Sequence, residues 1–228
     1  MKRLNEEWTG KAAGESLEDV IEGHLNRLFH RRSGWSHPVS GSDSEVMEAL
    51  LVSLIRPTET VLVPVYGPRG RGFAAICEAC GADPMVLDRE GEPVIDLKEL
   101  EAELRRRRPS VLIVSHSEPP AQGSAFMEAT GSICQELDVL LVADCAETFG
   151  DIPILSEGWH LDAVVGAPLP SLSLTVVAYN ERALAKLHNR RDSELPFLRL
   201  RDQWRSGESS GNAGRQGLLE LRKRLAEW

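Results

Sequence analysis

An aspartate at the end of a predicted buried strand is the residue of this sequence best placed to do chemistry. Residues 139–146 read Val-Leu-Leu-Val-Ala-Asp-Cys-Ala, so five apolar residues lead directly into the carboxylate of Asp144. Open α/β sheets bind ligands at the carboxyl ends of their strands, which makes Asp144 a candidate site residue. The alternative interpretation is an acid that caps a helix or closes a turn.

A polar turn that contains glycine offers a second candidate site. Gly41, Ser42, Asp43, Ser44 and Glu45 precede a helix predicted to run to about residue 55. The free backbone N–H groups of such a helix start can bind an anion. Plain capping by Ser42 or Ser44 is the alternative, and the charge of Asp43 would itself repel a phosphate.

A third group of candidates follows the strand predicted over residues 110–114. His116 and Glu118 lie in the next loop and have the residue types of an acid–base pair. A buried histidine that serves packing is the alternative for His116. Cys77 and Cys80 have the spacing of half a zinc site. No second half completes it, so we expect two small residues on a buried helix face and no metal site.

Charge and composition exclude several classes of protein. The net charge of −9 argues against a general nucleic-acid or anionic-membrane binder. The arginines at 105–108 fall at a predicted helix end, where cations complement the helix dipole. No apolar run is long enough to span a bilayer, and the first residues have no signal-peptide core. We therefore expect a cytoplasmic protein that binds neither nucleic acid nor membrane.

The elements needed to position these residues alternate along the chain. This alternation predicts an α/β fold, a mostly parallel sheet with helices on both faces. A loose arm over 1–15 would precede a main domain over 16–205, and a linker and C-terminal helix would fill 206–228, with the linker itself over 206–214. The expected helices cover 17–30, 43–55, 73–80, 97–107, 126–137 and 182–190, the strands 60–65, 84–87, 110–114, 139–144, 163–166 and 174–179, and a loop 66–72.

The order of these motifs resembles the large domain of class V aminotransferases of the alanine–glyoxylate and serine–pyruvate type. These are enzymes of fold type I that depend on pyridoxal phosphate (PLP). The turn at 41–45 resembles the family's phosphate-binding Gly-Ser-Gly-Thr-Glu, and residues 61–81 its next strand, loop and helix. His116 and Glu118 resemble its His-x-Glu, and 142–146 its Val-Asp-x-Val, whose Asp pairs with the pyridine nitrogen. The resemblance covers residues 20–200 and implies Ser42, Asp43, Ser44, His116, Asp144 and Ala146 as cofactor-binding residues.

The departures from the family pattern bear on activity. The family has the motif Gly-Ser-Gln-Lys after the strand equivalent to residues 163–166, and its lysine forms the Schiff base with the cofactor. This sequence has residues 166–170 there instead, so that Pro168 or Leu169 stands at the lysine position. Arg69 stands where the family places an aromatic residue against the cofactor, and Pro119 and Pro120 replace hydroxyl side chains. The small C-terminal domain, with its substrate-binding arginine, is missing from the sequence.

Three functions fit this pattern. The first is a degenerate homologue without transaminase turnover, which would hold a cofactor or act as a partner or scaffold subunit. The second is a working aminotransferase whose lysine is Lys186 or comes from a partner chain. The third is another chemistry that uses His116 and Glu118. Under the first two we expect a homodimer, or a heterodimer with a full-length relative, and under the first an apolar surface formed by the early helix and the C-terminal stripe of Leu218, Leu221, Leu225 and Trp228.

Overall fold

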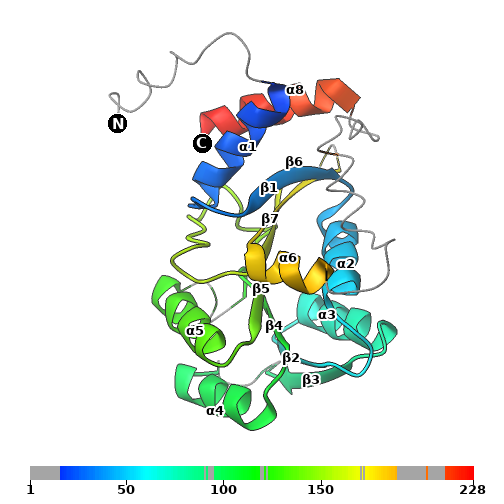
Figure 1. The fold of residues 1–228 in the computed structure, drawn as a ribbon, viewed down its shortest axis with the longest axis vertical. Helices are drawn as coiled ribbons and strands as arrows, with labels where there is room; N and C mark the ends of the chain where they lie inside the picture. The colour runs from blue at the N-terminus through cyan, green and yellow to red at the C-terminus, as the bar shows by residue number, and fades with distance from the viewer. Residues whose placement is uncertain are drawn as a thin grey trace.

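A seven-stranded sheet forms the centre of the molecule in the computed structural model (Figure 1). Its strand order is β1-β7-β6-β5-β4-β2-β3, and β7 runs antiparallel to both of its neighbours. The pairs among β3, β2, β4, β5 and β6 are parallel, which confirms the mostly parallel sheet. The structure describes residues 16–89, 91, 95–118, 121, 123–169, 171, 173–188, 204 and 214–228.

The expected alternation of strands and helices is present. The strands are β1 (Trp35–Ser40), β2 (Thr60–Val65), β3 (Asp83–Asp88), β4 (Val111–Ser115), β5 (Leu140–Asp144), β6 (Ala163–Leu169) and β7 (Leu174–Tyr179). The helices are α1 (Leu17–Leu28), α2 (Asp43–Leu54), α3 (Pro68–Ala79), α4 (Leu97–Arg107), α5 (Ser124–Glu136), α6 (Glu181–His188) and α8 (Gly214–Glu227).

Helices cover both faces of the sheet, so the fold has three layers. Apolar side chains of α1, α4, α5 and α8 join one core, which includes Leu25, Leu104 and Leu221. Side chains of α2, α3 and α6 join the core on the opposite face. Burial on both faces explains why the central strands read as continuous apolar runs rather than as alternating ones.

Among the differences from the sequence prediction, a missed strand and two shifted boundaries have a clear physical reason. The sequence pattern misses the edge strand β1, because Pro38 interrupts it and such residues are tolerated at sheet edges. Helix α3 begins at Pro68 rather than at 73, since proline is favourable at a first helical position, so most of the predicted loop 66–72 is helical. Strand β6 continues past residue 166 to Leu169 through a shift in its register with β7.

The C-terminal helix packs against the first helix and against β6 (Figure 1). Leu218, Leu221 and Leu225 are buried there, as are Ile21 and Leu25 of α1. The expectation of an apolar surface on these helices is therefore wrong for the three leucines, which pack against α1 and the sheet, whereas Trp228 of the same stripe is 39% exposed. The arm over 1–15 and the linker over 206–213 lie outside the described residues.

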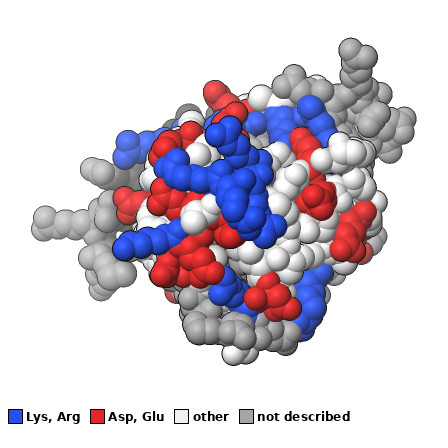
Figure 2. All heavy atoms as spheres, turned by 90° about the horizontal axis from the view of Figure 1, so that it is seen from below, with Lys and Arg blue, Asp and Glu red and all other residues white. Residues whose placement is uncertain are grey.

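The arginine run does end a helix, as predicted. Arg105, Arg106 and Arg107 form the last turn of α4. Arg105 pairs with Glu101 at 2.9 Å and Glu136 at 3.0 Å, and Arg106 pairs with Glu103 at 2.6 Å. Figure 2 looks at the molecule from below, the side on which α4 lies, and shows a group of basic side chains flanked by acidic ones. The ion pairs of Arg105 and Arg106 neutralise part of this basic group.

The paired cysteines also follow the packing interpretation. Cys77 is buried in α3, Cys80 is half-buried, and both are free thiols. Burial raises the pKa of Cys77 to about 12. Among the described residues, no group of three His, Cys, Asp or Glu side chains is arranged to hold a metal ion. Within the same part of the chain, no helix combines the length and hydrophobicity that a membrane crossing requires.

Two helical glycines provide a matched test of the packing. A Cβ atom at Gly131 of α5 would lie 1.9 Å from the carbonyl oxygen of Trp159, whereas one at Gly72 of α3 would meet nothing within 4 Å. We predict that Gly131→Ala lowers the free energy of unfolding by about 1–3 kcal/mol through overpacking. Gly72→Ala should raise it by about 0.5–1 kcal/mol, because alanine loses less backbone entropy. Urea unfolding of both variants checks this, and equal shifts would contradict it.

Candidate active site

Charged side chains from three segments of the chain meet at the carboxyl edge of the sheet. Arg69 lies in the first turn of α3, Asp144 ends β5, Asp43 begins α2 and Glu147 follows β5. Arg69 Nε donates to Asp144 Oδ2 at 2.6 Å, and Arg69 Nη2 donates to Asp43 Oδ2 at 2.9 Å. Arg69 Nη1 is 3.3 Å from Glu147 Oε1. One guanidinium therefore connects the strand-end acid to the start of α2.

Asp144 is buried, as its position after an apolar strand predicts. It is 2% exposed, and its Oδ1 accepts a hydrogen bond of 3.1 Å from the N–H of Ala146. Burial raises the pKa of Asp144, although Arg69 and the Ala146 N–H act in the opposite direction. Both carboxylate oxygens thus have partners within the chain.

Arg69 is the residue whose role the sequence prediction missed. Burial lowers its pKa, but Asp144 and Asp43 raise it by more, so the net pKa is raised and the guanidinium stays charged. The signal available in the sequence was charge. Three acids, Asp43, Glu118 and Asp144, are predicted at the same edge of the sheet, and such a group needs a cation nearby. The predicted loop hid it, because the direction of a loop side chain cannot be inferred from the sequence, whereas α3 places Arg69 in a first helical turn.

The start of α2 is closed by capping. Ser42 is the N-cap, and the side chain of Glu45 accepts from both the N–H and the Oγ–H of Ser42 at 2.8 Å. The capping interpretation of Ser42 is therefore confirmed. Asp43 faces Arg69, and the exposed Ser44 lines a groove of about 250 Å³ between α2 and α3 together with Phe73.

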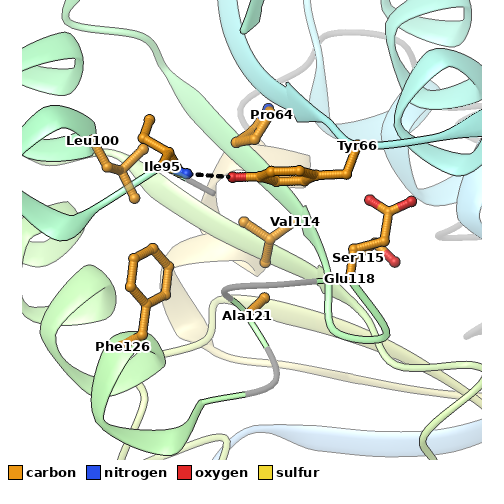
Figure 3. Close-up of a pocket in the computed structure, with 9 residues that line it drawn as sticks. All are labelled: Pro64, Tyr66, Ile95, Leu100, Val114, Ser115, Glu118, Ala121 and Phe126. Atoms are coloured by element: carbon orange, nitrogen blue, oxygen red, sulfur yellow. Dashed lines mark hydrogen bonds between the residues drawn. The ribbon is translucent and has the colours of Figure 1, made fainter. Parts of the chain in front are cut away.

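His116 and Glu118 do not form a pair in the described structure. His116 is fully buried, its Nδ1 lies 2.7 Å from Thr148 Oγ1, and its ring packs against Trp159 at 5.2 Å. Glu118 lines a separate slot of about 20 Å³ with Tyr66 and Ser115, where the Tyr66 hydroxyl accepts from the N–H of Ile95 at 3.2 Å (Figure 3). That volume holds about one water molecule, so the slot is too small for a cofactor.

A larger cavity of about 470 Å³ opens beside Arg69. Asp43, Glu147 and Pro168 line it, and α8 contributes Arg224 and Trp228. The guanidinium of Arg224 lies 4.7 Å from the centre of the Trp228 ring, which packs against Phe149. No local pattern predicts the contribution of α8, because it depends on how a distant segment packs back onto the molecule.

Lys186 lies at the opposite edge of the sheet. Its Nζ is 2.8 Å and 2.9 Å from the two carboxylate oxygens of Glu59, the residue before β2 begins. Strand β5 alone separates the two edges by about 13 Å, at ~3.3 Å per residue. This placement argues against Lys186 as a substitute for the missing lysine. None of the described residues that line the 470 Å³ cavity is a lysine, and Pro168 and Leu169 lie at the end of β6.

The sequence of this chain is similar to those of known aminotransferases. The (S)-ureidoglycine–glyoxylate transaminase of Bacillus subtilis (strain 168) is 30% identical over 162 residues, which are 69% of this chain and 39% of that protein. The alanine–glyoxylate aminotransferase of Rattus norvegicus is 27% identical over 188 residues, 79% of this chain and 45% of the relative. The chain is a homologue of the class V aminotransferases. It spans less than half the length of these two relatives, and no family model matches it.

Solved structures place the fold in the same family. The crystal structure of ureidoglycine-glyoxylate aminotransferase from Bacillus subtilis superimposes with a TM-score of 0.80 at 26% identity, covering 92% of this chain and 57% of that one. The alanine–glyoxylate aminotransferase of Nostoc sp. gives a TM-score of 0.78 at 23% identity, covering 93% and 59%. The sheet and its layers are those of the PLP-dependent transferase fold type I.

The residues of this chain do not fit PLP in the arrangement they adopt. The acid for the ring nitrogen, Asp144, is already bound to Arg69, and the Ser42 N–H and hydroxyl at the phosphate turn are bound to Glu45. Asp43 adds a negative charge where a phosphate would lie. The cavity also lacks a lysine among its described lining residues. Of the six predicted cofactor-binding residues, Asp43, Asp144 and Ala146 lie in one hydrogen-bonded cluster with Arg69. Ser42 and His116 bond to Glu45 and Thr148, and Ser44 lines the groove between α2 and α3.

The burial of His116 predicts a pH dependence of stability. Its Nε2 has no hydrogen-bond partner in the described structure, and burial lowers its pKa. The unfolded chain takes up a proton near pH 6.5 and the folded chain only at lower pH, so stability is lost as pH falls below about 6.5. We expect His116→Gln, which cannot titrate, to lose less stability than wild type between pH 7 and 5 in urea unfolding.

The matched control for this prediction is Gln135→Asn, an exchange of one amide for another at an exposed position of α5. It should keep the pH dependence of the wild type. If His116→Gln and wild type lose the same stability over that range, the neutral, buried state assigned to His116 is wrong.

Proposed function

We propose that this chain is a class V aminotransferase homologue without transaminase turnover, and that it acts as a partner or scaffold subunit in the cytoplasm. The observation that carries the proposal is the ion pair between Arg69 and Asp144, next to a cavity with no lysine among the described residues that line it. Transamination needs a lysine amine that bonds the cofactor and moves a proton at the substrate carbon. A fold persists without its chemistry, because packing rather than the site holds it together.

The charge of the cavity supports the same proposal. Asp43, Glu147 and Asp151 line the cavity together with two guanidinium groups, those of Arg69 and Arg224, so its described lining has a net negative charge. Burial raises the pKa of the nearby Glu118, the charge of Arg69 lowers it, and the charges of Glu147 and Asp144 raise it. Amino acids, 2-oxo acids and phosphate groups all carry anionic groups, so the net negative charge of the lining disfavours them.

The proposed assembly is a homodimer or a heterodimer with a full-length relative. Homology to the class V aminotransferases is compatible with it, and two-fold dimers are the commonest assembly of soluble oligomeric proteins. The alternative, a working aminotransferase with a lysine from a partner chain, makes the opposite prediction for the experiment that follows.

We predict that purified protein incubated with PLP and reduced with borohydride carries no stoichiometric adduct on a single lysine. We also predict no turnover of alanine with glyoxylate above the rate of free PLP, because the nucleophile is missing. Mass spectrometry of the reduced protein and a coupled assay provide the measurements. The Bacillus subtilis relative, treated identically, is the control. One modified lysine together with PLP-dependent turnover would contradict the proposal.

A further inference from the structure

A single arginine binds the carboxylates that a bound cofactor would contact. Arg69 donates to Asp144 from Nε at 2.6 Å and to Asp43 from Nη2 at 2.9 Å, although these two acids lie far apart in the sequence. We propose that Arg69 takes the place of the pyridinium at Asp144, so that the chain excludes PLP through an intramolecular ion pair.

Both oxygens of the Asp144 carboxylate already accept a hydrogen bond, and its negative charge is paired with a guanidinium. Its Oδ1 accepts from Ala146 and its Oδ2 from Arg69. A pyridinium N–H would have to displace the guanidinium, which cannot lose its charge to leave the acid free. The displaced Arg69 would also give up its ion pair with Asp43 or be strained to keep it. The ring nitrogen of PLP is therefore excluded because the charge of Asp144 is already paired with that of Arg69.

The phosphate end is closed by the same kind of interaction. Glu45 accepts from the Ser42 N–H and hydroxyl, the donors that an anion at this helix start would use. Asp43 stands between this turn and Arg69, so a phosphate would meet two carboxylates before it met a cation. Arg69 gains Asp43 as a partner only because that position holds an acid.

A second buried aspartate shows how this sheet treats such groups. Asp162, at the opposite edge, is 0% exposed and accepts from Leu141 N–H and Asn180 at 2.8 Å and from Arg182 at 3.0 Å. Asp144 has the same set of partners in kind: a backbone N–H and an arginine. Both carboxylates have hydrogen-bond partners and a paired charge within the chain. At Asp144, as at Asp162, an arginine and a backbone N–H bind the acid.

This inference deepens the proposed function, because it names what keeps the cofactor out, but it does not depend on the missing lysine. The test therefore uses 4-deoxypyridoxine 5-phosphate, which has the ring nitrogen and the phosphate but no aldehyde. Its binding cannot report a Schiff base, so a failure of this inference and a failure of the proposed function give different results.

The experiment is calorimetric titration of the ligand into the full chain. We expect no binding by wild type up to about 1 mM, and binding at least about tenfold tighter by Arg69→Gln, which frees Asp144 without adding a lysine. The double variant Asp43→Gly/Arg69→Gln should bind tighter still. Arg105→Gln is the matched control, because Arg105 also pairs with two carboxylates, but on the surface of α4. It should behave as wild type.

Two results would overturn the proposal. One is wild-type protein that binds the ligand as tightly as Arg69→Gln, and the other is folded Arg69→Gln that binds no better than wild type. Circular dichroism checks the fold of each variant. Should Arg69→Gln not fold, NMR of the Arg69 Nε–H in wild type replaces it. That signal should stay unshifted through the titration, whereas a saturable shift would refute the exclusion.

Discussion

The carboxylate of Asp144 is buried at the edge of the sheet, and the rest of the site follows from the need to neutralise it. An unpaired buried charge is costly, and removing one partner of a buried pair typically costs about 3–5 kcal/mol. The Asp144 side chain is 1% exposed and that of Arg69 is 25% exposed, so the acid depends on the arginine more than the reverse. Arg69 in turn draws Asp43 and Glu147 into contact, and these contacts set the shape of the cavity.

The position of Arg69 at the start of α3 is unfavourable for that helix. A cation in the first turn of a helix opposes the helix dipole by about 0.3–1 kcal/mol. Arg69 stands in that turn, directly after Pro68. Its approach to the sheet is possible because Gly70 packs closely on the backbone of β2, where an added Cβ would lie only 3.0 Å from the carbonyl oxygen of Pro64. Three carboxylates around one guanidinium outweigh the unfavourable helix position. The described residues at this edge of the sheet therefore form an ion-pair cluster rather than a site for an external anion.

Much of the fold was predictable from the sequence, because hydrophobic runs and capping residues act locally. The Ser42 cap and the central strands are where the pattern places them. The homology was predictable from the order of its motifs. The edge strand β1 and the early start of α3 were not, since sheet pairing and proline at a helix start override the local signals. The site divides in the same way: Asp144 was found by its position, whereas the pairing of Arg69 and the contribution of α8 depend on contacts between segments far apart in the sequence.

The central claim is that Arg69 and Asp144 form one energetic unit, and a double-mutant cycle on the free energy of unfolding tests it most directly. The variants are Arg69→Gln, Asp144→Asn and the two together, measured by urea unfolding at neutral pH. Residues in contact within one ion-pair network show coupling of about 0.5–3 kcal/mol, and we predict a value in the upper half of that range, with the double variant more stable than the sum of the single effects implies. Strictly additive effects would mean that Asp144 does not depend on Arg69, and the account of a site closed by its own arginine would fail.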